Sequence, residues 1–271
     1  MPKIGLCLAG GGARGAFQIG AAKVLEEHGI LAQVDAYSGT SIGSVNAAML
    51  ATKSVAEVYS LWLNVPADAL RNSESLFKRI IRERTAFVDN GVFKIDQLAS
   101  MIDEALDYDK LRSQEVYVTL SQGGYLDEGL FGLLKSSYQH YLKRDSQAVY
   151  MPVSGQPDAV LKQMLLASCS IPVVFPAVSL ANREYYDGGV YDNVPVKPLV
   201  EAGCDLIFVI HLHLLNIIRK DNYPGVRFVE IKHRRSLGAL LNFDPERSRK
   251  LFELGYRDAA AVIAEIPSPI W

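Results

Sequence analysis

Apolar positions near the start of the chain alternate between strand-like and helical spacing. Residues Lys3 to Ala9 are apolar or small after the lysine, which predicts a short buried strand. Three glycines interrupt this pattern, and apolar residues then recur between Phe17 and Leu25 at the spacing of one helix face. Asp35 to Ser38 predicts a second strand, which runs directly into a second glycine-containing turn. An alanine-rich helix is predicted after that turn, at Val45 to Thr52.

The remainder of the chain continues this alternation of strands and helices. Asp205 to His213 is nearly continuous in apolar residues, as expected for a strand buried on both faces. The other predicted elements are strands at Glu115 to Ser121 and Arg227 to Ile231, and helices at Ile95 to Leu106 and Pro245 to Glu265. No internal repeat and no linker rich in Pro, Gly or Ser is visible. We therefore expect a single α/β domain over residues 1–271, with a largely parallel sheet.

Composition and charge narrow the class of protein. Hydrophobic residues make up 49% and charged residues 21%, which is typical of globular chains and excludes wholesale disorder. Lys plus Arg is 28 and Asp plus Glu is 30, so the formal net charge is −2 and no nucleic-acid partner is expected. The three cysteines form no CxxC pair, which indicates a reducing, cytoplasmic compartment without a zinc or disulfide framework. The apolar stretch at the N-terminus is too short for the core of a signal peptide.

One uncharged run, Gln163 to Asn182, is 20 residues long, which is enough to span a bilayer. It contains Pro172 and Pro176 together with several Ser, Cys, Gln and Asn positions. We interpret it as buried core followed by an active-site loop, and we expect no transmembrane helix.

The first glycine motif, Gly10 to Gly15, allows three interpretations: a plain turn, a dinucleotide-binding loop and an oxyanion hole. The dinucleotide pattern G-x-G-x-x-G needs an acidic residue about 20 positions further on. Glu26 and Glu27 lie inside the predicted helix, which leaves Asp35 as a candidate. Consecutive glycines at a helix N-terminus present unobstructed N–H groups, and the helix dipole adds positive potential. The motif therefore favours an oxyanion hole over a plain turn or a dinucleotide-binding loop.

The second glycine motif, Gly39-Thr40-Ser41-Ile42-Gly43, has the G-x-S-x-G pattern of a nucleophile elbow. The glycines are needed because the serine occupies a sharp, strained turn between strand and helix. The alternative is another glycine-rich turn in which Ser41 caps the helix. A second such turn close in sequence favours the elbow, because a nucleophile needs oxyanion donors nearby.

A serine needs a base to accept its proton, and the sequence leaves two kinds of base open. Three histidines follow Asp187, namely His211, His213 and His233, so the order Ser, acid, His of a triad esterase is available. Against that triad, too little chain precedes Ser41 for the strands that usually precede such an elbow. His211 and His213 share a strand face, but no third metal ligand has matching spacing, so we interpret them as structural residues.

A third motif completes a pattern that resembles a known family. Asp187-Gly188-Gly189 is a turn signal, and it lies between an apolar block, Ala167 to Pro176, and the sequence Asn193-Val194-Pro195. Together with the two earlier glycine motifs, these segments occur in the order found in patatin-like phospholipases. The matched motifs extend from Gly10 to Pro195, about two-thirds of the chain.

This resemblance implies a three-layer α/β/α sandwich and a reaction on acyl lipids. It implies that Ser41 is the nucleophile and that Asp187 is its general base, as a dyad without histidine, metal or cofactor. The amides of Gly10, Gly11 and Gly12 would form the oxyanion hole, with Arg14 nearby. The glycines that support the motifs are Gly39, Gly43, Gly188 and Gly189.

The expected substrates are fatty-acyl esters of phospholipids, lysophospholipids or neutral lipids. Burial among apolar residues such as Ile171 to Phe175 would raise the pKa of Asp187 and make it a better base. Two basic clusters, Lys78 to Arg84 and Lys232 to Arg235, would support peripheral contact with anionic membranes, although solvated surface residues explain them equally well. The alternatives kept are a Ser-His-Asp esterase and a nucleotide-binding module that uses Gly10 to Gly15.

Overall fold

The computed structural model describes residues 2–65, 100, 102–122, 148–170, 178–180 and 183–266. Several features that the sequence singled out lie outside these ranges. They are half of the helix expected at 95–106, the basic cluster at 78–84 and the apolar block at 171–175.

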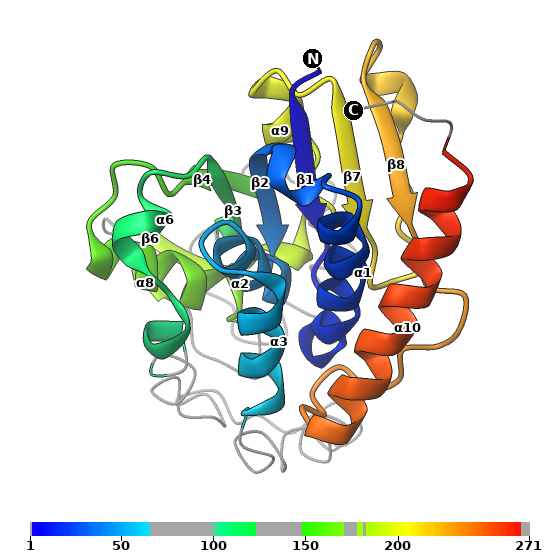
Figure 1. Ribbon diagram of the computed structural model, residues 1–271. Helices are drawn as coiled ribbons and strands as arrows, with labels where there is room; N and C mark the ends of the chain where they lie inside the picture. The colour runs from blue at the N-terminus through cyan, green and yellow to red at the C-terminus, as the bar shows by residue number, and fades with distance from the viewer. Residues whose placement is uncertain are drawn as a thin grey trace, which may run out of the picture.

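A single mixed sheet forms the centre of the described structure (Figure 1). Its strand order is β5-β6-β3-β2-β1-β7-β8, with β4 paired to β3. The strands are β1 Ile4–Leu8, β2 Val34–Thr40, β3 Val116–Gln122, β4 Ala148–Pro152, β5 Val178–Leu180, β6 Arg183–Asp187, β7 Leu206–Ile210 and β8 Arg227–Ile231. The run β3-β2-β1-β7-β8 is parallel, as expected from the sequence. The antiparallel pairing of β4 and β6 with β3, and of β5 with β6, was not anticipated.

Helices cover both faces of this sheet. The α-helices are α1 Ala16–Glu27, α2 Ile42–Leu50, α3 Val55–Leu63, α6 Tyr108–Leu111, α8 Asp158–Ser168, α9 Lys197–Glu201 and α10 Pro245–Ala264. The 3-10 helices are η1 Gly12–Gly15, η2 Leu31–Gln33, η4 Gly188–Val190 and η5 Lys220–Asn222. In Figure 1, α1 and α10 lie against each other in front of the sheet, while α9 lies behind β1 and β2. The architecture is therefore a three-layer α/β/α fold. Among the described helices, none has the combination of length and apolar character needed to cross a membrane.

Alternation along the central strands explains the two layers of helices. On β1, Leu6 and Leu8 belong to the larger core beneath α1, α2 and α10, whereas Cys7 belongs to a smaller core beneath α9. On β7, Phe208 faces the larger core and Val209 faces the smaller one. Successive side chains of a strand point to opposite faces, so a strand that is apolar at every position must be covered on both sides.

Strand β3 brings two distant parts of the chain together along one edge. β4 pairs with β3 from Tyr117 to Ser121 and so occupies one edge of that strand. β2 and β6 must therefore share the opposite edge, end to end. Thr40, the last residue of β2, pairs with Thr119, and Asp187, the last residue of β6, pairs with Leu120. The residue that follows Thr40 is consequently placed beside Asp187.

The carboxyl end of β1 lies at a topological switch point. From β1, the chain proceeds to β2 and β3 on one side, while β7 and β8 lie on the other. Ligand sites of open α/β sheets form in the crevice outside the carboxyl ends of the strands at such a point. Both glycine motifs, 10–15 and 39–43, follow strands that end here.

Candidate active site

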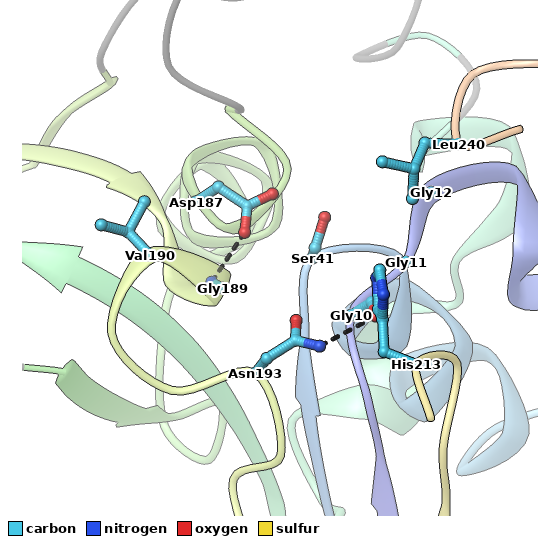
Figure 2. A pocket seen from close by; sticks show the side chains of 10 residues that line it. All are labelled: Gly10, Gly11, Gly12, Ser41, Asp187, Gly189, Val190, Asn193, His213 and Leu240. Carbon is cyan, nitrogen blue, oxygen red and sulfur yellow. Dashed lines mark hydrogen bonds between the residues drawn. The ribbon is translucent and has the colours of Figure 1, made fainter. Parts of the chain in front are cut away.

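A cavity of about 250 Å³ lies at this switch point (Figure 2). Residues from five segments line it: Gly10, Gly11, Gly12, Ser41, Asp187, Gly189, Val190, Asn193, His213 and Leu240. In Figure 2 the Ser41 hydroxyl occupies the centre, with Asp187 on one side and the glycine loop on the other. The structure therefore brings the three motifs of the sequence to one site.

Ser41 lies on a strained turn between β2 and α2. Its φ of 55° and ψ of −129° make it the only non-glycine residue with positive φ in the described part of the chain. A Cβ on Gly39 would collide with the backbone of Gly43, and one on Gly43 would collide with the Leu8 carbonyl. This is the physical reason for glycine on both sides of the serine, as the G-x-S-x-G motif predicts.

The buried hydroxyl of Ser168 fixes the backbone of this turn by hydrogen bonds. It accepts a hydrogen bond from the Ser41 amide at 2.9 Å and donates to the Thr119 carbonyl at 2.7 Å. The Ser44 hydroxyl lies 2.9 Å from it, and since the Ser168 proton is already donated, Ser44 is the donor. All three groups are buried. Ser168 thus links the elbow to β3 and to the end of α8.

Asp187 is buried at the end of β6, with only 6% of its surface exposed. Its Oδ1 accepts a hydrogen bond from the Gly189 amide at 2.7 Å (Figure 2). Burial raises the pKa of Asp187 to about 6, against the lowering effect of hydrogen bonds from the Ser41 hydroxyl and the Gly189 amide. Gly188 packs against the Thr119 carbonyl, where a side chain has no room. The Asp-Gly-Gly motif therefore fixes a carboxylate of raised pKa next to the serine.

The glycine loop after β1 is held by backbone hydrogen bonds on two sides. The Gly10 amide donates to the Asn193 carbonyl at 3.1 Å, and the Asn193 side chain donates back to the Gly10 carbonyl at 3.2 Å. Gly12 has a φ of +55° and lies against the Leu240 carbonyl, which accepts from the Ala13 amide at 2.6 Å. Within the described residues, the amides of Gly11 and Gly12 have no hydrogen-bond acceptor, and both residues line the cavity.

Arg14 stabilises this loop by hydrogen bonds that lie outside the cavity. Its Nε donates to the Gly238 carbonyl at 2.9 Å, and its Nη1 lies 3.2 Å from Nδ1 of His213. Arginine can only donate, so Nδ1 of His213 accepts. Burial lowers the pKa of His213, and the neighbouring positive charge of Arg14 lowers it further, which keeps the imidazole neutral. Arg14 is not among the residues that line the cavity, and it joins the glycine loop to the loops carrying Gly238 and His213.

None of the three candidate histidines, all of which the structure describes, connects Ser41 to Asp187. His211 is fully buried and pairs with Glu230 at 2.9 Å, and His233 bonds to the Arg235 carbonyl at 2.7 Å. His213 lines the cavity, but Figure 2 places it beside the glycine loop, on the side of Ser41 away from Asp187. A Ser-His-Asp relay requires the imidazole between the two other groups, and this geometry does not provide it.

The acidic residue required for a dinucleotide site lies at the wrong end of the sheet. Asp35 is near the start of β2, where its Oδ2 accepts from the Ile4 amide at 2.8 Å. Ile4 begins β1, whereas the glycine loop follows the end of β1. The carboxylate that would bind a ribose is therefore separated from the loop by the length of the strand, which argues against a nucleotide-binding module.

Two residues of the site were not assigned roles from the sequence. Asn193 and Ser168 belong to quoted motifs, but neither titrates nor attacks, and their contribution is to hold the backbone of other segments. The signal for both was their place in these motifs: Asn193 lies two positions before Pro195, and Ser168 is the first of two serines in the block that begins at Ala167. The middle of the uncharged run, 171–177, lies outside the described residues, so its interpretation as an active-site loop stays a prediction.

Comparison with curated proteins identifies a fungal relative. Lysophospholipase nte1 of Aspergillus terreus is 54% identical over 229 residues. The match covers 82% of this chain but only 12% of that protein, so the chain corresponds to a small part of it.

Solved structures with this fold are more distant in sequence. VipD from Legionella pneumophila matches with a TM-score of 0.52 and 14% identity, over 97% of this chain and 67% of that one. The ExoU–SpcU complex of Pseudomonas aeruginosa gives 0.53 and 18%, over 97% and 52%. Human GIVD cytosolic phospholipase A2 gives 0.51 and 10%, over 97% and 60%. A profile described as patatin-like phospholipase matches residues 6–200, which include every motif of the site. The chain belongs to the patatin-like phospholipase family.

Proposed function

We propose that this protein is a serine lipid acyl hydrolase that works through a Ser41–Asp187 dyad. The observation that carries the proposal is the convergence of three features on one cavity. These are a serine on a strained turn, a buried carboxylate of raised pKa beside it, and glycine amides without acceptors facing it. Each feature lowers the stability of the folded state, and proteins retain such destabilising features mainly at active sites.

In the first half-reaction, the Ser41 oxygen attacks the carbonyl carbon of an acyl ester while Asp187 accepts the hydroxyl proton. The pKa of about 6 lets Asp187 remain ionised near neutral pH and still accept a proton better than an ordinary aspartate. The tetrahedral intermediate then collapses, and the protonated Asp187 returns its proton to the leaving alcohol. The acyl group remains on Ser41 as an ester.

In the second half-reaction, water takes the place of the alcohol. Asp187 removes a proton from the water as its oxygen attacks the acyl-enzyme. The fatty acid leaves, and the Ser41 oxygen recovers its proton from Asp187. No metal or cofactor enters this scheme, because the carboxylate moves the proton and the glycine amides stabilise the charge.

The oxyanion would be bound by the amides of Gly11 and Gly12. Both lie beside the first turn of a helical segment, η1 continuing into α1, where the dipole favours negative charge. The Gly10 amide is already used by Asn193, and the Ser41 amide by Ser168. We therefore assign Gly10 and Arg14 to positioning the loop, and Gly11 and Gly12 to direct donation. In another serine hydrolase, the loss of one such donor costs about 3 kcal/mol of transition-state stabilisation.

The substrate class follows from the family and the relative. A patatin-like phospholipase domain and a relative named lysophospholipase both favour fatty-acyl esters of phospholipids or lysophospholipids. Such substrates are presented at membranes, so we propose peripheral membrane contact, with neither nucleic acid nor cofactor. The described strands form one sheet, and the three cysteines are buried and unpaired, which supports a single domain in a reducing, cytoplasmic compartment.

Labelling with a fluorophosphonate tests the proposal directly. The reagent transfers its phosphonyl group to an activated serine, so mass spectrometry of the digested protein should find the modification on Ser41. Labelling should compete with lysophosphatidylcholine and follow the same pH dependence as ester hydrolysis. Absence of labelling in a protein that is folded by circular dichroism would contradict the proposed nucleophile.

Ser168→Ala is expected to slow acylation by about tenfold, because the Ser41 amide would lose its acceptor in a buried site. The change should lower kcat more than it raises KM, since Ser168 touches the elbow and not the cavity. Ser170→Ala is the matched control. Ser170 is also buried and donates to a helix carbonyl, Leu166, but has no bond to Ser41. Equal losses of kcat in both variants would show that Ser168 acts only through general stability.

A further inference from the structure

Exposed apolar side chains are concentrated on two loops of the described structure. Among the described residues, six large apolar side chains are exposed, and five of them lie on these loops. We call these five the apolar rim: Val190, Tyr191, Leu214, Leu215 and Ile217. Leu215 is 90% exposed and Ile217 is 82% exposed, so neither side chain packs against the fold. The sixth residue, Tyr256, lies on α10 and bonds to Glu27.

Both loops begin at the walls of the active-site cavity. Val190 is itself a lining residue, and Leu214 follows directly after the lining residue His213. Figure 2 shows Val190 and His213 on opposite sides of Ser41. Beyond the exposed tip, Ile218 is buried in the smaller core and so ties the loop back to the sheet. The rim therefore stands on two sides of the cavity and is anchored by buried residues.

Basic residues lie beside the apolar rim. β7 and β8 are parallel neighbours, and their last residues, Ile210 and Ile231, pair with each other. The residues that follow the two strands therefore leave the sheet side by side at its carboxyl end. Lys220 and Lys232 both pair with Glu230, at 2.9 Å and 2.8 Å, which holds the two following segments together.

Three arginines next to these lysines complete a positive surface. Arg219, Arg234 and Arg235 are exposed, and none forms an ion pair within the described part of the chain. We call them the basic flank. Their charges are available to an external anionic group, whereas those of Lys220 and Lys232 are partly neutralised by Glu230.

We propose that the apolar rim and the basic flank form the surface by which the protein docks on an anionic phospholipid bilayer. Apolar side chains at a loop tip enter the boundary between head groups and acyl chains, and arginines beside them bind lipid phosphates. This inference rests on the proposed function in that docking would place the cavity mouth, and Ser41 beneath it, against the source of acyl esters. The formal charge of −2 means that the attraction must come from this local surface and not from the whole chain.

The proposed occupant is a bilayer because the arrangement of apolar and basic groups on this surface matches the arrangement of hydrocarbon and phosphate in a bilayer. A bilayer presents charged phosphates at its surface and hydrocarbon chains just beneath them. The protein presents exposed leucine and isoleucine at the tip and unpaired arginine around it. The position at the mouth of a cavity that holds a nucleophile elbow adds a reason for a lipid in particular.

Cosedimentation of the full chain with vesicles tests the docking surface. The vesicles are phosphatidylcholine alone and phosphatidylcholine mixed with phosphatidylserine. The double variant Leu215→Ser/Ile217→Ser is expected to bind both vesicles at least about tenfold more weakly. Arg234→Gln/Arg235→Gln is expected to weaken binding to the mixed vesicles by about tenfold, with a smaller effect on neutral ones. Tyr256→Ser, an exposed aromatic on α10, is the control and should bind as the parent does.

Hydrolysis of a soluble short-chain acyl ester separates docking from folding and from catalysis. The rim variant should keep this activity, because neither substituted residue lines the cavity. Ser41→Ala should lose the activity and keep vesicle binding. If the parent protein hydrolyses no ester but its vesicle binding depends on the rim, the proposed function fails and the docking surface stands. Unchanged vesicle binding in the rim variant overturns the docking surface, as does a rim variant that only converts a dimer to a monomer in sedimentation velocity.

Discussion

Ser41→Ala is expected to lower the rate of acyl-ester hydrolysis by roughly 10⁴-fold and to abolish fluorophosphonate labelling. The effect is large because, among the described residues that line the cavity, only Ser41 carries a hydroxyl. Alanine keeps the Cβ that already tolerates a φ of 55°, and the Ser41 amide keeps its bond to Ser168. The variant should therefore unfold in urea at nearly the same concentration as the parent. Activity and the urea midpoint, measured on the same preparation, check both statements.

A serine in the first turn of α2, the helix that follows Ser41, provides the matched control. Ser44 lies three positions after Ser41 and is fully buried, and its hydroxyl donates to Ser168 instead of facing the cavity. Ser44→Ala should retain labelling at Ser41 and most of the hydrolysis rate. Labelling that persists in Ser41→Ala, or disappears in Ser44→Ala alone, would place the nucleophile elsewhere.

Asp187→Asn is expected to lower kcat by roughly 10³-fold, because the amide cannot accept the serine proton. In the parent protein, kcat/KM should fall on acidification below the Asp187 pKa of about 6, by about tenfold per pH unit. This acid limb should be missing from the residual activity of the variant. A pH profile of hydrolysis for both proteins provides the measurement.

The same substitution should stabilise the fold. The pKa of Asp187 rises from 3.8 to about 6 on folding, so the folded state binds a proton more tightly than the unfolded chain. Stability associated with this group is fully present below pH 3.8 and is lost as the pH rises through about 6. The loss amounts to about 3 kcal/mol at neutral pH. Asparagine carries no charge to bury, so the free energy of unfolding of Asp187→Asn should exceed that of the parent at neutral pH and not at acid pH.

Asp192 offers a control for both effects. It is a partly buried carboxylate whose pKa is also raised by desolvation, but it bonds to the Tyr150 hydroxyl at 2.6 Å and the Val194 amide at 3.0 Å, outside the cavity lining. Asp192→Asn should keep the acid limb of the pH profile. If Asp187→Asn retains parental activity while His213→Ala loses it, a histidine is the base and the dyad is wrong.

The parallel part of the fold could be predicted from hydrophobic spacing. The strands expected at 3–9 and 227–231 are confirmed as β1 and β8, and the helix expected at 245–265 is confirmed as α10. These elements are long or apolar enough for their own periodicity to identify them. The strand expected at 205–213 ends at Ile210, because His211 and the residues after it turn toward the site and η5.

The antiparallel edge could not be predicted in the same way. β5 has three residues and β6 carries three charged positions among five, so neither shows an apolar alternation. Their pairing depends on a long-range partner, β3, which local sequence does not reveal. The family motifs still pointed to Asp187, because the turn that carries it has glycines that are visible in the sequence. The side chains of Asn193 and Ser168 form hydrogen bonds with the backbone of distant segments, and only the structure shows those bonds.

The shared edge of β3 makes the geometry of the proposed dyad dependent on strand register. Thr40 and Asp187 occupy consecutive positions along β3, opposite Thr119 and Leu120. Because side chains alternate between faces, a slip of β6 by one residue would turn the Asp187 carboxylate to the far side of the sheet. Turnover therefore depends on the correct register of the short antiparallel strand β6. Local unfolding of β5 and β6 would stop turnover even while the parallel strands remained folded. Loss of activity during gentle denaturation is then a measure of local opening, which precedes the collapse of the whole fold.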